Sequence, residues 1–220
     1  MRKWLIFLIF LTLTGCSKSS EENLNIQTDE ESVLSSFVSE NVITYDGILD
    51  YTHIITPSIS DNKLITSFEG ELKDLVGESI FFKLSYQIDG PILKELYYSD
   101  NPGNLYFTSI IPEKVLLKAP LEVGNSWDQE FTNNSISHKA KTTLVKIELS
   151  DSGKRLYTTE TVVFGIKGYK DDRYYEKTIF EENYGIIYFE KSLELVKNEA
   201  GEYEEIGFNF SYWARGKQIN

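Results

Sequence analysis

Side chains that could carry out chemistry are few in this chain. The two histidines, His53 and His138, lie far apart, and neither has a second histidine or a cysteine at zinc-ligand spacing. The acidic pairs Asp171-Asp172 and Glu181-Glu182 could act as glycosidase carboxylates or bind calcium weakly, but acidic residues in turns are more often solvated. The sequence has no nucleophile elbow. We therefore expect no catalytic residue, no metal site and no cofactor, and we do not expect an enzyme.

The most informative reactive residue is Cys16, the only cysteine among 220 residues. It follows a basic start at Arg2 and Lys3 and an apolar stretch from Trp4 to Leu13. At about 1.5 Å per residue, this stretch would span roughly 15 Å as a helix, which is too short to cross a hydrocarbon core of ~30 Å. Its length is typical of the apolar core of a signal peptide.

The segment Leu13-Thr14-Gly15-Cys16 resembles the lipobox of bacterial lipoproteins, in which a leucine and two small residues precede the lipid-bearing cysteine. The resemblance implies cleavage between Gly15 and Cys16 and acylation of Cys16, which would anchor the protein in a membrane. An ordinary signal peptide followed by an incidental cysteine is the alternative, and the position of the sole cysteine argues against it. We expect an exported protein of the bacterial cell envelope, anchored in the outer membrane if the host has two membranes.

The rest of the chain is expected to form a tether and one domain. Residues 16–31 are rich in serine and acid and predict a flexible tether. Residues 32–220 can bury a core without disulfides and predict a single β domain. Removing residues 1–15 takes Arg2 and Lys3 from the 22 basic residues and leaves 20 against 34 acidic ones, a net charge of −14. This charge argues against a nucleic-acid partner and is typical of a soluble surface.

Alternation of apolar and polar residues predicts strands through most of this domain. In the segment 79–88, large apolar side chains that include Phe82 and Tyr86 fall on one face, and after a turn the segment 92–98 returns as a second strand. The segment 29–40 is the one helical candidate, and the alternative is a last disordered stretch of the tether followed by a strand. We expect a mainly β fold: a single strongly curved antiparallel sheet, a half-barrel meander of about ten strands, with at most one or two short helices.

The most specific pattern in the domain is Lys-Ala-Pro-Leu-Glu-Val-Gly-Asn-Ser-Trp at 118–127, followed some fifty residues later by a Tyr-Gly turn. The pair resembles a pattern in small bacterial lipoproteins that carry a Pro-Leu-x-x-Gly-x-x-Trp element. Such families generally resemble the lipoprotein-carrier fold, a strongly curved antiparallel sheet like an unclosed barrel, whose members hold lipid or acyl chains in the concave face. We interpret six residues of the pattern as structural: Pro120, Leu121, Gly124, Trp127, Tyr184 and Gly185.

Two functions fit these observations. The first is an anchored binding or carrier module for an apolar or lipid-like ligand, lined by Phe82, Tyr86, Phe208 and Phe210, although these side chains could equally be ordinary core. The second is a structural or protein-interaction lipoprotein of the envelope without a small-molecule ligand. The expected partners are a membrane, through acylated Cys16, and either the apolar ligand or an envelope protein.

Overall fold

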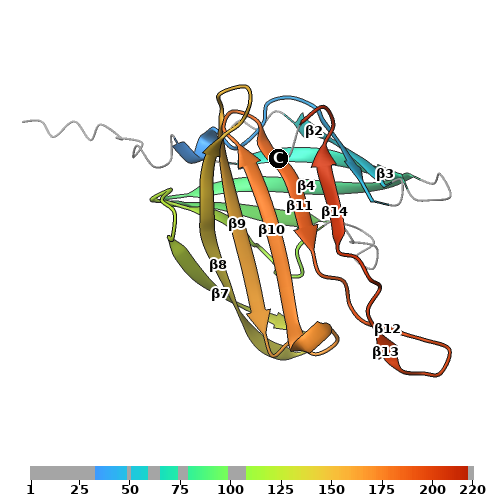
Figure 1. Ribbon diagram of the computed structural model, residues 1–220. Helices are drawn as coiled ribbons and strands as arrows, with labels where there is room; N and C mark the ends of the chain where they lie inside the picture. The colour runs from blue at the N-terminus through green and yellow to red at the C-terminus, as the bar shows by residue number, and fades with distance from the viewer. Residues whose placement is uncertain (1–32, 49–50, 59–64, 74–78, 99–107, 218–220) are drawn as a thin grey trace, which may run out of the picture.

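The computed structural model describes residues 33–48, 51–58, 65–73, 79–98 and 108–217, which form a β-rich domain (Figure 1). The expected signal peptide, the tether and the lipidation site at Gly15 and Cys16 lie outside the described residues. The strands in chain order are β1 (Ile43–Gly47), β2 (Thr52–Ser58), β3 (Ile65–Lys73), β4 (Ser79–Asp89), β5 (Ile92–Tyr98), β6 (Val115–Lys118), β7 (Ser126–Asn133), β8 (Ile136–Leu149), β9 (Arg155–Phe164), β10 (Arg173–Glu181), β11 (Gly185–Lys191), β12 (Val196–Lys197), β13 (Tyr203–Glu204) and β14 (Phe210–Ala214).

Twelve of these strands form one antiparallel sheet with the order β6-β5-β4-β3-β2-β1-β14-β11-β10-β9-β8-β7, and β12 and β13 form a separate hairpin. The expectation of a mainly β fold built on one strongly curved antiparallel sheet is confirmed. Two details differ from it. The large sheet has twelve strands instead of about ten. It is also not a simple meander, because β14 returns to lie between β1 and β11.

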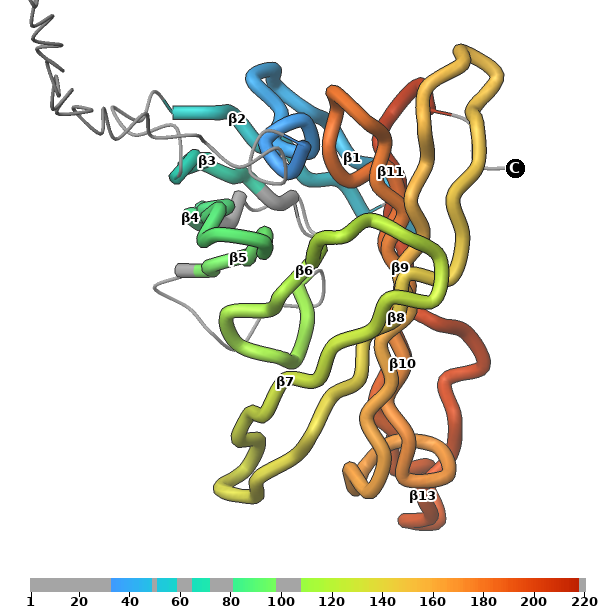
Figure 2. Tube along the Cα trace, turned by 90° about the vertical axis from the view of Figure 1, so that its left-hand side faces the viewer, coloured from blue at the N-terminus to red at the C-terminus, as the bar shows by residue number. Residues whose placement is uncertain are grey.

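The large sheet curves so strongly that it is nearly closed. Figure 2 shows β2 to β5 facing β8 to β11 across the interior, with the chain passing from β6 to β7 between them. The curvature follows from the twist of antiparallel strands and from register shifts between β5 and β6, β8 and β9, and β10 and β11, since such bulges bend a strand. As the two ends of the strand order, β6 and β7 border the seam of the sheet.

Strand alternation places large apolar side chains on the inner face. On β4, Phe82 and Tyr86 are buried whereas Phe81 is 72% exposed on the outer face. Gly70 on β3 lies opposite Phe82, and a Cβ atom at Gly70 would lie 2.0 Å from the Phe82 ring. Because glycine has no Cβ, the Phe82 ring can lie flat across β3 and fill the interior.

Helical structure is confined to short segments among the described residues. Residues 33–35 form a helical turn, and η2 (Lys170–Asp172) is a short 3-10 segment. After the turn, Phe37 is buried, and its ring meets those of Tyr157 and Phe180 edge-on at centroid distances of 5.0 and 6.1 Å. Within the described residues, the helix expected over 29–40 is therefore short and covers one end of the interior.

Candidate functional site

The Pro-Leu-x-x-Gly-x-x-Trp element forms the connection between β6 and β7. Pro120 is exposed, Leu121 packs against the main core, and Gly124 has the positive φ of +93° that this turn requires. Trp127 is buried, and its indole Nε1 donates a hydrogen bond of 3.2 Å to the carbonyl of Val115 on β6. The element therefore holds the two ends of the sheet together.

Gln129 on β7 adds further hydrogen bonds across the seam. Its Oε1 accepts a bond of 2.9 Å from the backbone N–H of Val115, and its Nε2 donates to the carbonyls of Pro112 and Glu113 at 3.0 and 3.1 Å. Among the described residues, β6 and β7 are not paired in the strand ladder. The side chains of β7 therefore satisfy backbone groups that an open sheet edge would leave to water.

The Tyr-Gly turn lies between β10 and β11, next to the helical turn. Gly185 has φ +108°, and a Cβ there would lie 3.0 Å from the carbonyl oxygen of Phe37. The neighbouring Asn183 N–H donates a bond of 2.7 Å to the carbonyl of Ser36. The ring of Tyr184 lies 4.0 Å from the ammonium of Lys217. Gly185 thus allows the close backbone approach that fixes the N-terminal segment to the sheet.

The four candidate ligand-lining residues are not all in one place. Phe82, Tyr86 and Phe210 are buried in the same core cluster. Phe208 is 44% exposed and lies outside the strands, because the chain bends at Gly207, with φ +84°, and β14 begins only at Phe210. The structure therefore brings three of the four residues together and leaves the fourth on the surface.

Aromatic rings from the two halves of the sheet meet in the interior. Tyr45 stacks on His53 at a centroid distance of 4.4 Å, and Tyr212 meets both rings edge-on at 5.1 and 4.8 Å. Tyr51 meets Phe210 edge-on at 5.1 Å. Burial among these rings lowers the pKa of His53 to about 3, so its imidazole is neutral at physiological pH.

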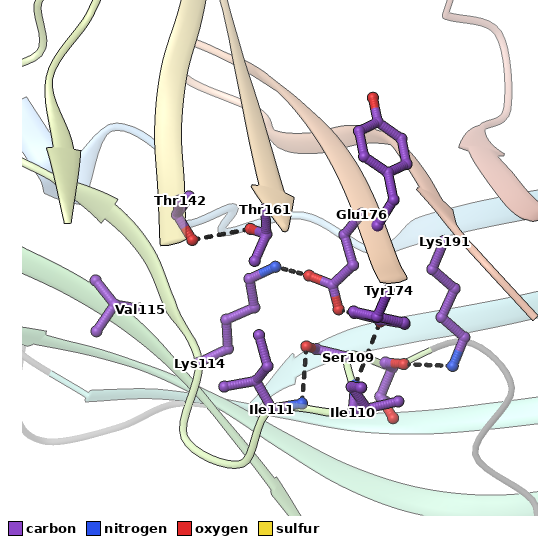
Figure 3. Close-up of polar contacts among 12 residues, drawn as sticks. Ser109, Ile110, Ile111, Lys114, Val115, Thr142, Thr161, Tyr174, Glu176 and Lys191 are labelled. Carbon is purple, nitrogen blue, oxygen red and sulfur yellow. Dashed lines mark hydrogen bonds and ion pairs between the residues drawn. The ribbon is translucent and has the colours of Figure 1, made fainter. Parts of the chain in front are cut away.

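A buried ion pair links the segment 108–114, which leads into β6, to β10 (Figure 3). Lys114, 3% exposed, forms an ion pair with Glu176, which is fully buried. The other carboxylate oxygen of Glu176 accepts a hydrogen bond from the hydroxyl of Tyr174. Nearby, the ammonium of Lys191 donates a bond of 2.7 Å to the carbonyl of Thr108. Two ammonium groups thus tie the segment that enters β6 to the opposite wall of the sheet.

Glu95 on β5 is a second carboxylate that faces inward. It is paired directly with Tyr86 in the β4–β5 register, and directly paired residues project from the same face of a sheet. The Tyr86 hydroxyl donates a hydrogen bond to the Glu95 carboxylate. On the same face of β5, Leu93 is buried, whereas Glu95 and Tyr97 are partly exposed. Glu95 therefore projects from the inner face of β5, beside Tyr86.

Glu95 and Lys114 affect each other's pKa values. Desolvation raises the pKa of Glu95 to about 7, opposed by the positive charge of Lys114 and the hydrogen bond from Tyr86. Desolvation likewise lowers the pKa of Lys114 to about 7, opposed by the Glu95 carboxylate. The Glu95 charge also contributes to raising the pKa values of Tyr45 and Tyr212. Glu95 and Lys114 can therefore both change protonation state near neutral pH.

This arrangement is suited to recognition. An apolar and aromatic interior with a few converging polar groups is the usual composition of a small-molecule site. Within the described ranges, no group of three or more His, Cys, Asp or Glu side chains could hold a metal ion. In the same part of the chain, no helix has the length and apolar character needed to cross a membrane.

Sequence reasoning missed Glu95, Lys114 and Glu176. Glu176 had a signal, because it shares the strand face of Tyr174 in an alternating segment and should have been assigned to the interior. Glu95 had none, since the segment 92–98 carries apolar residues on both faces.

Comparison with protein-family models, with curated proteins and with solved structures finds no significant match for this chain. The resemblance to lipoproteins with a Pro-Leu-x-x-Gly-x-x-Trp element therefore stays a prediction from the sequence. The site has to be interpreted from its own geometry.

Proposed function

We propose that this chain is an exported, lipid-anchored envelope protein whose curved sheet binds an apolar or lipid-like ligand on its inner face. The observation that supports ligand binding is the composition of the interior near β5. Inward-facing Glu95 and Tyr97 are partly exposed there, beside the buried rings of Phe82 and Tyr86. A ligand could place its apolar part against these rings and its polar end at the carboxylate. The proposal assigns binding and no catalytic residue.

The ligand part of the proposal is tested by native mass spectrometry of the full chain after gentle extraction from membranes, together with titration of an apolar fluorescent probe. We expect a co-purifying apolar mass that is released on unfolding, and saturable probe binding. A matched pair of variants locates the site. Tyr97→Asp places a charge on the inner face and should abolish probe binding, whereas Phe81→Asp places it on the outer face and should not. Absence of both a bound mass and probe binding would refute the ligand proposal.

The anchor part of the proposal has a separate test, because residues 13–16 lie outside the described residues. Cells grown with radiolabelled palmitate should incorporate label into the wild-type chain and not into Cys16→Ala. The variant should also leave the membrane fraction. Label that persists in Cys16→Ala would show that the anchor is not at this cysteine.

A protein-interaction role is the second candidate, and the β12–β13 hairpin favours it. The hairpin extends away from the large sheet (Figure 1) and exposes 64% of Tyr203, with Phe208 44% exposed in the segment that follows. Cross-linking in cells should then capture one stoichiometric envelope protein. The double variant Tyr203→Ser with Phe208→Ser should no longer capture that protein. Phe81→Ser, which removes an exposed aromatic side chain from the outer face of the sheet, is the control and should still capture it.

A further inference from the structure

Residues 194–208 form an arm that connects β11 to β14 and contains the β12–β13 hairpin. The two strands that it connects are paired directly, with Lys191 opposite Phe210, and the adjoining Ser192 and Asn209 still bond the sheet. Most connections in compact domains are about 4–6 residues long, and hairpin loops only about 2–5. A short turn would therefore join β11 to β14, and the large sheet itself does not require the arm.

The arm presents large apolar side chains at its surface. Four such side chains are exposed within it: Val196, Tyr203, Ile206 and Phe208. Single apolar residues on a surface are ordinary, but several gathered on one projecting segment mark an interaction site. The arm extends away from the large sheet, so these side chains can contact another molecule (Figure 1).

Contacts within the arm and at its base hold it in one shape. At the tip, Oδ1 of Asn198 accepts hydrogen bonds of 3.0 and 2.9 Å from the backbone N–H groups of Ala200 and Glu202. At the base, Lys170 forms an ion pair of 2.6 Å with Glu205. A segment that already has a defined shape loses less conformational freedom when it binds.

The charge of the arm indicates what can cover it. The arm contains five glutamates and one lysine, which gives a net charge of −4. The lysine, Lys197, lies 5.2 Å from the ring centroid of Tyr203 within the arm itself. An anionic membrane surface would repel this arm, and so would the arm of a second copy. A protein surface with basic groups around an apolar recess complements both its charge and its exposed rings.

We propose that the arm is the docking element for a second, different protein, whose contact surface holds Tyr203 and Phe208 in an apolar recess bordered by lysine or arginine. This inference rests on the second candidate function, the protein-interaction role, and names the chemistry of the partner. Tyr203 is the anchor, since tyrosine is among the residues that dominate binding energy at interfaces. Glu199 and Glu202, exposed in the turn between β12 and β13, meet the basic border.

The arm lies at the opposite end of the domain from the helical turn at residues 33–35 (Figure 1). The chain enters the domain through that turn from its proposed anchor. A protein that docks on the arm therefore leaves the anchored end of the domain uncovered.

Site-specific photo-cross-linking tests the partner. The full chain with Tyr203→p-benzoylphenylalanine is irradiated in cells of the host, and the cross-linked peptide is identified by mass spectrometry. We expect one protein adduct, joined at a surface with more lysine and arginine than aspartate and glutamate. Phe81→p-benzoylphenylalanine, at an exposed position on β4, is the matched control and should not give this adduct. An adduct of two copies of this chain, or an adduct with lipid alone, would overturn the proposal.

Charge reversal tests the basic border. Added to the photo-cross-linking chain, Glu199→Lys with Glu202→Lys should lower the adduct yield at least ten-fold. Glu69→Lys with Glu122→Lys makes the same change of charge at two other exposed positions and should leave the yield unchanged. In membranes from the same cells, raising the salt from about 0.1 M to about 1 M shortens the screening length from about 10 Å to about 3 Å, and the yield should fall. Equal yields for both charge-reversed chains would refute a basic partner.

Replacing residues 196–204 by an Asn-Gly turn tests whether the arm has only a structural role. Val196 and Glu204 are directly opposite, so a two-residue turn can join Leu195 to Glu205. We expect the shortened chain to keep its unfolding midpoint and any binding of the apolar probe, and to lose the partner in chemical cross-linking. A shortened chain that does not fold would show that the sheet needs the arm and would overturn the inference.

The outcomes separate this inference from the function on which it rests. If the intact arm captures no protein, the protein-interaction role fails and the inference fails with it. If the arm captures one protein and charge reversal has no effect, the interaction role stands and the basic partner is wrong. Binding of the apolar probe tests the ligand function separately, since the replaced residues lie outside the large sheet.

Discussion

Replacing His53 by phenylalanine should make the protein more resistant to acid. His53 lies on β2 and is 3% exposed, with its ring stacked on Tyr45 and edge-on to Tyr212. Phenylalanine has a ring of similar size and can keep these contacts. It has no nitrogen to protonate, so the variant isolates the cost of charging a buried imidazole.

The size and sign of the effect follow from the pKa. Burial lowers the pKa of His53 from 6.5 to about 3, so between these values the unfolded chain binds a proton that the folded chain does not. Stability contributed by neutral His53 is therefore complete above the unfolded pKa and is lost as the pH falls, until the folded pKa is reached. At about 1.36 kcal/mol per pH unit, the loss amounts to about 3 kcal/mol at pH 4.

Urea unfolding at pH 7.5 and pH 4 measures this effect. Other groups titrate in the same range, and Glu95 acts in the opposite direction, so the informative quantity is the change in wild type minus the change in His53→Phe. We expect wild type to lose about 3 kcal/mol more than the variant. His138→Phe, which removes a partly exposed imidazole on β8, is the control for loss of a histidine as such. Parallel pH dependence of wild type and His53→Phe would show that the His53 ring is not desolvated and would refute the reasoning.

Three further variants test the packing that surrounds the site. Lys114→Met should destabilise the fold by about 3–5 kcal/mol in denaturant unfolding, because it leaves the fully buried Glu176 without its ion-pair partner; a loss below 1 kcal/mol would contradict the pairing. Gly70→Ala should cost about 1–3 kcal/mol, since its Cβ would overlap the Phe82 ring, and combining it with Phe82→Leu should recover part of the loss; additive losses would argue against the contact. Gln129→Ala should cost about 1–3 kcal/mol and speed hydrogen exchange at the first amide of β6, and unchanged exchange there would show that the seam is held by other contacts.

The sequence predicted the strands better than their order. Period-2 alternation identified β4 and β5 because one inner face and one outer face differ clearly in polarity along β4. The insertion of β14 between β1 and β11 could not be predicted, since strand pairing far apart in the sequence is decided by the whole core. Phe208 was expected on the face of Phe210, but a single glycine bend at Gly207 moved the start of the strand past it. Alternation alone does not show where a strand begins.

Charged residues in the interior were harder to predict than apolar ones. A sequence pattern assigns polar residues to the outer face by default, and the position of Lys114 depends on a segment that folds against β10 from far away in the chain. Trp127 is buried, but its hydrogen bond to the β6 edge could not be predicted without the knowledge that the sheet nearly closes.

The cost of the buried charges leads to a final prediction. Replacing a buried ion pair by uncharged residues of similar volume is often neutral or stabilising by about 1–4 kcal/mol, so stability alone does not explain why Lys114 and Glu176 are charged. The double variant Lys114→Met with Glu176→Gln removes one charge of each sign, and the glutamine keeps an oxygen for Tyr174. The double variant should therefore be at least as stable as wild type in urea unfolding, whereas Lys114→Met alone should lose about 3–5 kcal/mol. A double variant that loses as much stability as Lys114→Met would show that the unpaired charge of Glu176 is not what destabilises the single variant.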